Sequence, residues 1–231
     1  MSFASTLQDR GLLQYLRWVR ASSQVAIEGA IAGSTMLTLW HEWMLCVLAG
    51  AHGLQNIAVY VWDQPDIERS MRVVTRLGFH VIVARRSNAW GVRAMREWLG
   101  AGQDRIVAIT LDGPAGPRRI AKPGVVRLAR LAGVPLCPLD VSASSEFELQ
   151  GWDRCVMPRA RGHITLRILP EVSASAPAAE VAQSIERRLN EAPAHVGARS
   201  PSRLRGLPGL AWARACTLPL QLGTVTVGAR R

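Results

Sequence analysis

The sequence predicts an α/β fold, in which a mostly parallel central sheet is flanked by helices and preceded by a short N-terminal amphipathic helix. Short apolar runs alternate with helical segments of about a dozen residues, a pattern typical of parallel strands joined by crossover helices. With 231 residues, 48% of them hydrophobic, the chain is long enough to bury one substantial core. Arginine-bearing loops follow several apolar runs, where open α/β sheets place their ligands.

The individual elements follow from hydrophobic periodicity and from glycine and proline punctuation. Strands are predicted at 35–40, 56–62, 80–84, 105–111, 134–141 and 163–172. Helices are predicted at 41–53, 66–78, 89–102, 122–133 and 178–192. The run "VPLCPLDV" carries two prolines, which remove backbone donors and therefore suit an edge strand or an irregular one.

The N-terminal segment 1–24 has the pattern of an amphipathic helix. Its apolar positions are Leu12, Leu13, Leu16 and Val19, among which stand Tyr15, Trp18 and the arginines 10, 17 and 20. Two interpretations stay open: a helix packed on the domain, or an interfacial helix with aromatic side chains at headgroup depth.

Composition divides the rest of the chain into two parts. Residues 25–194 hold all the predicted strands and the crossover helices, and we expect them to form one domain. Residues 195–231 contain six arginines but no lysine and no acidic residue. We expect this basic tail to be loosely ordered, or disordered, unless it associates with a membrane.

Charge and cysteine content limit the possible partners. The net charge of +11, carried almost wholly by arginine, favours partners with phosphate groups or an anionic membrane surface. No recognition helix or aromatic RNA-binding signature is present, so we expect no nucleic acid partner. The four cysteines are widely spaced, which argues against a disulfide framework or a zinc site. We expect no metal, no signal peptide and no membrane-spanning helix.

The stretch "ITLDGPAGPRR", residues 109–119, builds a stiff cationic turn directly after a predicted strand. It is not a nucleotide-binding P-loop, because no G-K-[ST] follows the glycines and its prolines lack the N–H donors that such a loop uses. A structural turn with solvated arginines is one interpretation. In the other, the backbone at Gly113 approaches a phosphate while Arg118, Arg119 and Lys122 face it.

Two further loops follow strands in the same way. His41 follows the strand 35–40 and begins a helix, where an imidazole is well placed to act as a general base; the alternative is a structural histidine among tryptophans. Arg86 and Ser87 follow the strand 80–84, at a helix N-terminus suited to an anion, or simply as a capped helix start. Three such loops on successive strand ends favour a binding site.

The order of motifs resembles a known family. The blocks "LWHEWML", "DIERSMRVVTRLGFHVIVARRSNAWGVRAM", "AITLDGPAGPRRIAKPGVVRLARLAGVPLCPLDVSAS" and "WDRCVMP" are similar to the bacterial DUF374 family. That family is a branch of the lysophospholipid acyltransferase (glycerophosphate acyltransferase-like) superfamily. The resemblance spans roughly residues 25–194 and implies the corresponding fold.

The resemblance also implies a reaction. It points to transfer of a fatty acyl group from a thioester, acyl-CoA or acyl carrier protein, to a hydroxyl of a lysophospholipid or related lipid. His41 would be the general base, with Asp112 and Gly113 in the phosphate motif. The superfamily carries an aspartate five residues after its histidine, where this chain has Cys46. We therefore expect another acid to orient His41: Asp112 first, then Asp66 or Glu42.

The sequence thus predicts a peripheral acyltransferase at the cytoplasmic face of the inner membrane. It would need no cofactor beyond its acyl donor as co-substrate. Ala115 stands where many family members have an arginine, which leaves a second class open: a non-catalytic module that binds lipids or anions on the same scaffold.

Overall fold

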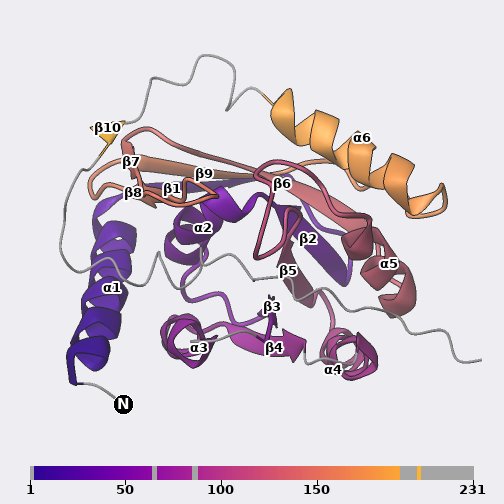
Figure 1. Cartoon of the computed structure of the whole chain (residues 1–231), viewed down its shortest axis with the longest axis horizontal. Coiled ribbons are helices and arrows are strands. Elements are labelled where there is room, and N and C mark those ends of the chain that lie inside the picture. Colours follow the sequence, from indigo (N-terminus) through magenta and orange to yellow (C-terminus); the bar gives the residue numbers. More distant parts are fainter. Residues whose placement is uncertain (1–2, 64–66, 85–87, 193–201, 204–231) are drawn as a thin grey trace, which may run out of the picture.

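A seven-stranded sheet forms the centre of the molecule in the computed structural model, which describes residues 3–63, 67–84, 88–192 and 202–203 (Figure 1). The strand order is β1-β9-β6-β2-β5-β3-β4. The strands are β1 (Gln24–Glu28), β2 (Thr35–Leu39), β3 (Ile57–Trp62), β4 (His80–Ala84), β5 (Ile106–Thr110), β6 (Leu136–Ala143) and β9 (His163–Ile168). Every neighbouring pair is parallel except β6 with β9. The α/β class with a mostly parallel sheet is therefore confirmed.

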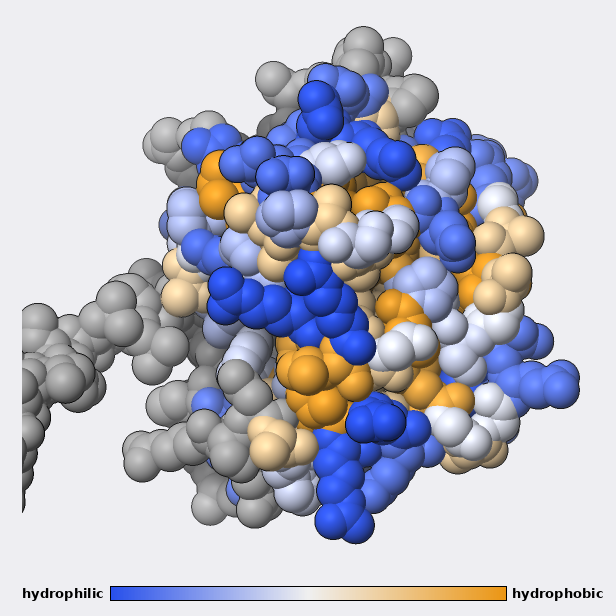
Figure 2. Space-filling model, turned by 90° about the vertical axis from the view of Figure 1, so that its right-hand side faces the viewer, coloured by the Kyte–Doolittle hydropathy of each residue, from blue (hydrophilic) through white to orange (hydrophobic). Residues whose placement is uncertain are grey.

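Helices cover both faces of this sheet. On one side lie α1 (Phe3–Ser22), the short 3-10 helix η1 (His41–Trp43) that leads into α2 (Met44–Gly50), and α3 (Ile67–Arg76). On the other side lie α4 (Asn88–Gly100), α5 (Pro123–Ala132) and α6 (Ala178–Asn190). Figure 2 shows this second side, where hydrophobic groups are exposed among strongly hydrophilic ones.

The register of the central strands decides which loops meet. Parallel β2 and β5 are paired with Leu39 opposite Thr110. The residue two positions beyond each of these is His41 and Asp112, respectively, so the pairing brings both to the same carboxyl edge of the sheet. All five residues of β2 are buried, as expected of a central strand between two helical layers.

The proline-bearing strand β6 is not an edge strand, although its composition suggests one. It pairs with β2 as far as Pro138, opposite Thr38, and with β9 from Leu139 onward. Pro138 therefore stands where β6 changes neighbours, and its carbonyl accepts a hydrogen bond of 2.9 Å from the backbone N–H of Leu169. The backbone N–H that proline lacks would lie at this change of neighbours. The strand is therefore irregular, which was the second of the two possibilities that its prolines suggested.

A second, three-stranded sheet has no counterpart among the predicted elements. Its strands are β7 (Glu146–Glu148), β8 (Val156–Pro158) and β10 (Ser202–Arg203), in the order β10-β7-β8. Strands β7 and β8 form an antiparallel hairpin, and the connection between them is residues 149–155. Each strand has only two or three residues, too few for hydrophobic alternation to reveal. Strand β1 was missed as well, because it is largely exposed at the sheet edge.

Helix α1 packs against α2 and α3. Leu13, Leu16 and Val19 are buried, which agrees with the packed interpretation of this apolar face, while Trp18 remains 52% exposed. The buried carboxylate of Asp9 forms an ion pair with Arg72 of α3, with 2.8 Å between Oδ2 and Nη2. Within the described residues, no helix is both long and apolar enough to span a bilayer. The predicted tail lies outside the described residues apart from 202–203.

Candidate functional site

His41 lies at the carboxyl edge of the sheet, in the 3-10 turn between β2 and α2. Its side chain is mostly buried, and its Nδ1 atom lies 2.6 Å from Oδ2 of Asp153. A carboxylate only accepts hydrogen bonds, so Nδ1 is the donor and Nε2 is left as the acceptor nitrogen. Within the described part of the chain Nε2 has no hydrogen-bond partner. The contact with Asp153 therefore fixes the orientation of the imidazole and leaves Nε2 available to a ligand.

Asp153 comes from the connection of the β7–β8 hairpin, and it is 1% exposed. Its second oxygen, Oδ1, accepts a hydrogen bond of 3.3 Å from the backbone N–H of Cys155. The neighbouring Trp152 places its ring 5.3 Å from the imidazole, centroid to centroid, at 43°. The hairpin thus both orients His41 and covers it.

The prediction that Asp112 orients the imidazole is wrong. The Asp112 carboxylate instead accepts two backbone hydrogen bonds, 3.0 Å from the N–H of His41 and 3.1 Å from the N–H of Arg119. Burial raises the pKa of Asp112, and these hydrogen bonds to its ionised form oppose that rise. Asp112 therefore ties the turn after β5 to the turn after β2, at the level of the backbone.

Glu42 does not contact the imidazole either. Its buried carboxylate receives Arg118 Nε at 2.6 Å and Arg119 Nε at 2.7 Å. Arg118 also donates to the backbone carbonyl of Asp153, at 3.1 Å. Two arginines predicted to face a phosphate thus neutralise Glu42 and connect the three loops around His41. Three other predicted residues, Asp66, Arg86 and Ser87, lie outside the described residues.

The turn at 112–119 depends on two glycines with positive φ, +68° at Gly113 and +69° at Gly116. A Cβ on Gly116 would lie 2.6 Å from the ring of Trp152, so only glycine allows the turn and the hairpin to approach this closely. The predicted cationic residue Lys122 immediately precedes α5, and its backbone N–H donates to the carbonyl of Leu111 at 2.9 Å.

Cys46, five positions after His41, lies in α2. The thiol is buried, donates to the carbonyl of Val156 at 3.8 Å, and has its pKa raised chiefly by burial. Buried structural thiols of this kind are inert. Within the described residues, no cluster of three or more histidine, cysteine or acidic side chains could hold a metal ion.

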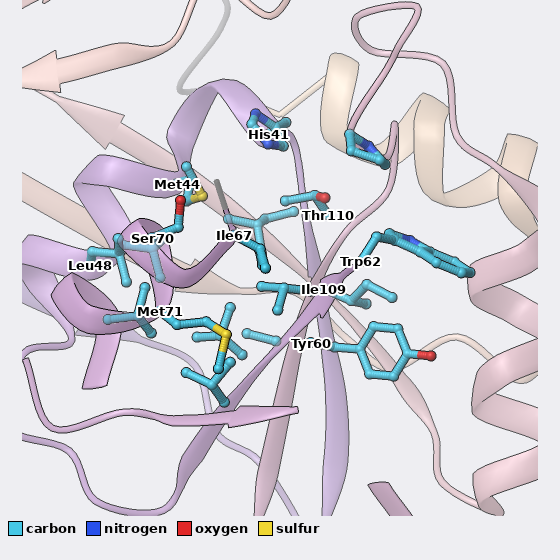
Figure 3. Close-up of a pocket in the computed structure, with 18 residues that line it drawn as sticks. His41, Met44, Leu48, Tyr60, Trp62, Ile67, Ser70, Met71, Ile109 and Thr110 are labelled. Atoms are coloured by element: carbon cyan, nitrogen blue, oxygen red, sulfur yellow. The ribbon is translucent and has the colours of Figure 1, made fainter. Parts of the chain in front are cut away.

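An apolar cavity of about 90 Å³ extends from His41 between the sheet and helices α2 and α3 (Figure 3). Figure 3 shows His41 at one end, Met44 and Thr110 near it, and Met71 toward the other end. Nearly all the lining is aliphatic or aromatic. A second cavity, of about 410 Å³, lies on the α5 side of the same edge and is lined by the turn at 112–116.

The sequence alone does not reveal the contact of Asp153 with His41. The block "WDRCVMP" contains it, but neither its spacing nor its local pattern links it to His41, which is 112 residues away. The local sequence shows only an acidic residue between a tryptophan and a short apolar run, which does not by itself indicate a catalytic role. Only the tertiary contact assigns it a role.

Comparisons with known proteins find similarity in sequence and in overall fold. No family model matches the chain. An uncharacterized protein of Rickettsia prowazekii (strain Madrid E) is 27% identical over 156 residues, which are 67% of this chain and 68% of that protein. The crystal structure of the 1-acyl-sn-glycerophosphate (LPA) acyltransferase PlsC from Thermotoga maritima superposes with a TM-score of 0.49. It is 15% identical, over 84% of this chain and 81% of that one. Similarity at this level does not decide the function, which depends on the site itself.

Proposed function

We propose that the chain is an acyltransferase that moves a fatty acyl group from a thioester donor to a hydroxyl of a lysophospholipid or related lipid. The observation that carries this proposal is the His41–Asp153 pair at the end of an apolar cavity. An oriented imidazole supplies the base that a hydroxyl nucleophile needs, and an apolar cavity beside it suits an acyl chain.

The pair supports a simple reaction sequence. Nε2 of His41 takes the proton of the acceptor hydroxyl as its oxygen attacks the thioester carbonyl. Asp153 stabilises the imidazolium that forms. Collapse of the tetrahedral intermediate breaks the carbon–sulfur bond, and the imidazolium returns the proton to the leaving thiolate. The products are the acylated lipid and the free thiol of coenzyme A or of an acyl carrier protein.

The apolar cavity must widen to hold a long chain. A cavity of about 150 Å³ accommodates one benzene ring, so about 90 Å³ holds only part of a fatty acyl group. Met44 and Met71 line it, and the flexible thioether side chains of methionine adapt to irregular spaces. Their rearrangement would open the space between α2 and α3.

The same proposal includes a place of action. Lipid acceptors are reached from a membrane surface, and the net charge of +11 attracts the chain to anionic lipids. We therefore propose a peripheral protein of the cytoplasmic face of the inner membrane.

The test is acyl transfer by the purified protein, with labelled acyl-CoA and acyl carrier protein donors and a panel of bacterial lysolipids. Wild type, His41→Ala and the control His163→Ala are compared, because His163 is exposed at the start of β9. We expect turnover in wild type and control, and a loss of at least about 100-fold in His41→Ala. Equal turnover in all three proteins would refute the role of His41. Lysolipid binding without turnover in any of them would favour the non-catalytic module.

A further inference from the structure

Glu42 follows His41 directly in the chain, and the proposed reaction assigns it no role. Its side chain is 1% exposed and receives two guanidinium groups. Nε of Arg118 lies 2.6 Å from Oε2, and Nε of Arg119 lies 2.7 Å from Oε1. Nη2 of each arginine contacts the same oxygen as its Nε. Each arginine therefore approaches with two donors, which fixes the orientation of both guanidinium planes.

Arg118 extends this contact to the hairpin. Besides Glu42, its Nε donates to the backbone carbonyl of Asp153, at 3.1 Å. The carboxylate of Asp153 holds Nδ1 of His41 at 2.6 Å. The peptide bond between residues 41 and 42 closes a ring of four residues: His41, Asp153, Arg118 and Glu42. Because no member of a closed ring can move without lengthening another contact, the ring fixes the hydrogen bond at Nδ1.

Arg119 is connected to the site in another way. Its backbone N–H donates to Asp112 at 3.1 Å, and Asp112 in turn accepts the backbone N–H of His41. Both of these hydrogen bonds persist when the side chain of Arg119 is replaced. The two arginines therefore offer a comparison. The side chain of Arg118 donates to Asp153, whereas this link of Arg119 runs through its backbone.

We propose that Glu42 is a positioning residue for the base, acting through Arg118 to hold Asp153 against Nδ1 of the imidazole. The inference rests on the proposed function and adds to it a residue that acts through its neighbours. Without this hold the Asp153 carboxylate can turn away from the ring. The imidazole then divides between its two tautomers. The tautomer with its proton on Nε2 cannot take the proton of the acceptor hydroxyl.

The first experiment measures acyl transfer by Glu42→Gln and by Arg118→Lys, with wild type beside them. Glutamine keeps the size of the side chain but offers one acceptor oxygen instead of two. Lysine lacks the planar fork that reaches both partners of Arg118 at once. We expect kcat to fall about 10- to 50-fold in each variant, less than the full contribution of a general base, with KM within about twofold. Unchanged kcat in both variants would overturn the proposal.

Two controls separate positioning from a loss of stability. Asp9→Asn breaks the buried ion pair with Arg72, which joins α1 to α3. It should lower the melting temperature and leave kcat within about twofold. Arg119→Lys should lose kcat by a factor at least about fivefold smaller than Arg118→Lys. If Asp9→Asn lost as much kcat as Glu42→Gln, the effect would be one of stability alone, and the proposal would fail.

A double variant tests the path through the hairpin. If Glu42 acts through Asp153, then Glu42→Gln should cost kcat only about twofold or less in an Asp153→Asn background, because the residue that it positions is already disabled. The same fold-loss in both backgrounds would show that the two acids act independently, which contradicts the proposal.

A measurement without substrate distinguishes failure of this inference from failure of the proposed function. In protein with isotopically labelled histidine, couplings between the ring nitrogens and the carbon-bound protons report the tautomer of the neutral imidazole. The signal of His41 is assigned by its absence in His41→Ala. We expect the Nδ1–H tautomer in wild type and Asp9→Asn, and a mixture in Glu42→Gln and Arg118→Lys.

If wild type transfers no acyl group, the proposed function fails, and the tautomer still tests the positioning. A mixture confined to Glu42→Gln and Arg118→Lys then supports the role of Glu42. A wild-type tautomer in both variants refutes it.

Discussion

The turn at 112–119 and the β7–β8 hairpin each bring one buried carboxylate to His41, yet the two carboxylates do different work. Asp112, from the turn, accepts the backbone N–H of His41 at 3.0 Å. Asp153, from the hairpin, contacts the imidazole at 2.6 Å. Asp112 holds the backbone of His41, whereas Asp153 holds its imidazole ring. Proximity of an acid to a histidine therefore does not define its role, whereas the atom that it contacts does.

The largest expected effect comes from the hairpin. In Asp153→Asn the amide oxygen can still accept from the Cys155 N–H, which turns the NH₂ group toward Nδ1 of His41. The imidazole is then driven into the tautomer that carries its proton on Nε2, so it cannot act as a base. We expect kcat for acyl transfer to fall by about 100-fold or more, with a nearly unchanged melting temperature. Retained kcat in a folded Asp153→Asn protein would contradict the assignment.

The corresponding change in the turn should act mainly on stability. In Asp112→Asn only one side-chain oxygen remains, so one of the two backbone N–H groups faces an NH₂ group instead of an acceptor. We expect the free energy of unfolding to fall by about 1–3 kcal/mol, measured by urea denaturation, with a smaller loss of kcat than in Asp153→Asn. If instead Asp112→Asn lost more activity than Asp153→Asn at unchanged stability, the roles of the two acids would be reversed.

The smallest expected effect is a pH dependence of stability that arises in the hairpin and not in the turn. Burial and the nearby Glu42 raise the pKa of Glu146, in the hairpin, from 4.5 to about 7. The native state then holds this proton more tightly than the unfolded chain, so its contribution lowers stability as the pH rises from 4.5 to 7. Because Glu146 is only half-buried, we expect Glu146→Gln to recover about 1 kcal/mol above pH 7.

Thermal unfolding at pH 4.5 and pH 8 measures this difference. Glu146→Gln should melt about 2–4 °C above wild type at pH 8 and equal to it at pH 4.5. The control Glu171→Gln removes an exposed acid outside the hairpin, and it should give no gain. An equal gain at both pH values would show that the effect is not the ionisation of Glu146.

The central strands could be predicted because their local pattern and their burial agree. The strand 80–84 was predicted with the bounds of β4, and the buried run at 35–40 became β2. The hairpin could not be predicted in this way. Its strands have three residues each, and half-buried side chains such as Glu146 and Phe147 show no periodicity.

The candidate site divides similarly. The sequence placed His41 and Asp112 at strand ends, and parallel pairing of β2 with β5 brought them together. The sequence also suggested that Arg118 and Arg119 face a ligand. In a sequence, however, an arginine that binds a phosphate cannot be told from one that binds a carboxylate of the same chain. Glu42, adjacent to His41 in the chain, decides between the two by contacting both arginines.

By itself, the sequence determined the α/β class, most of the central strands and the position of His41, because hydrophobic periodicity and strand-end polarity are local signals. Only the tertiary structure decided which acid contacts the imidazole, which carboxylate Arg118 and Arg119 contact, and where the cavities lie. Those properties arise from contacts across many residues, such as the 112 that separate His41 from Asp153. Their energies depend on distance and burial, which the linear order of residues does not contain.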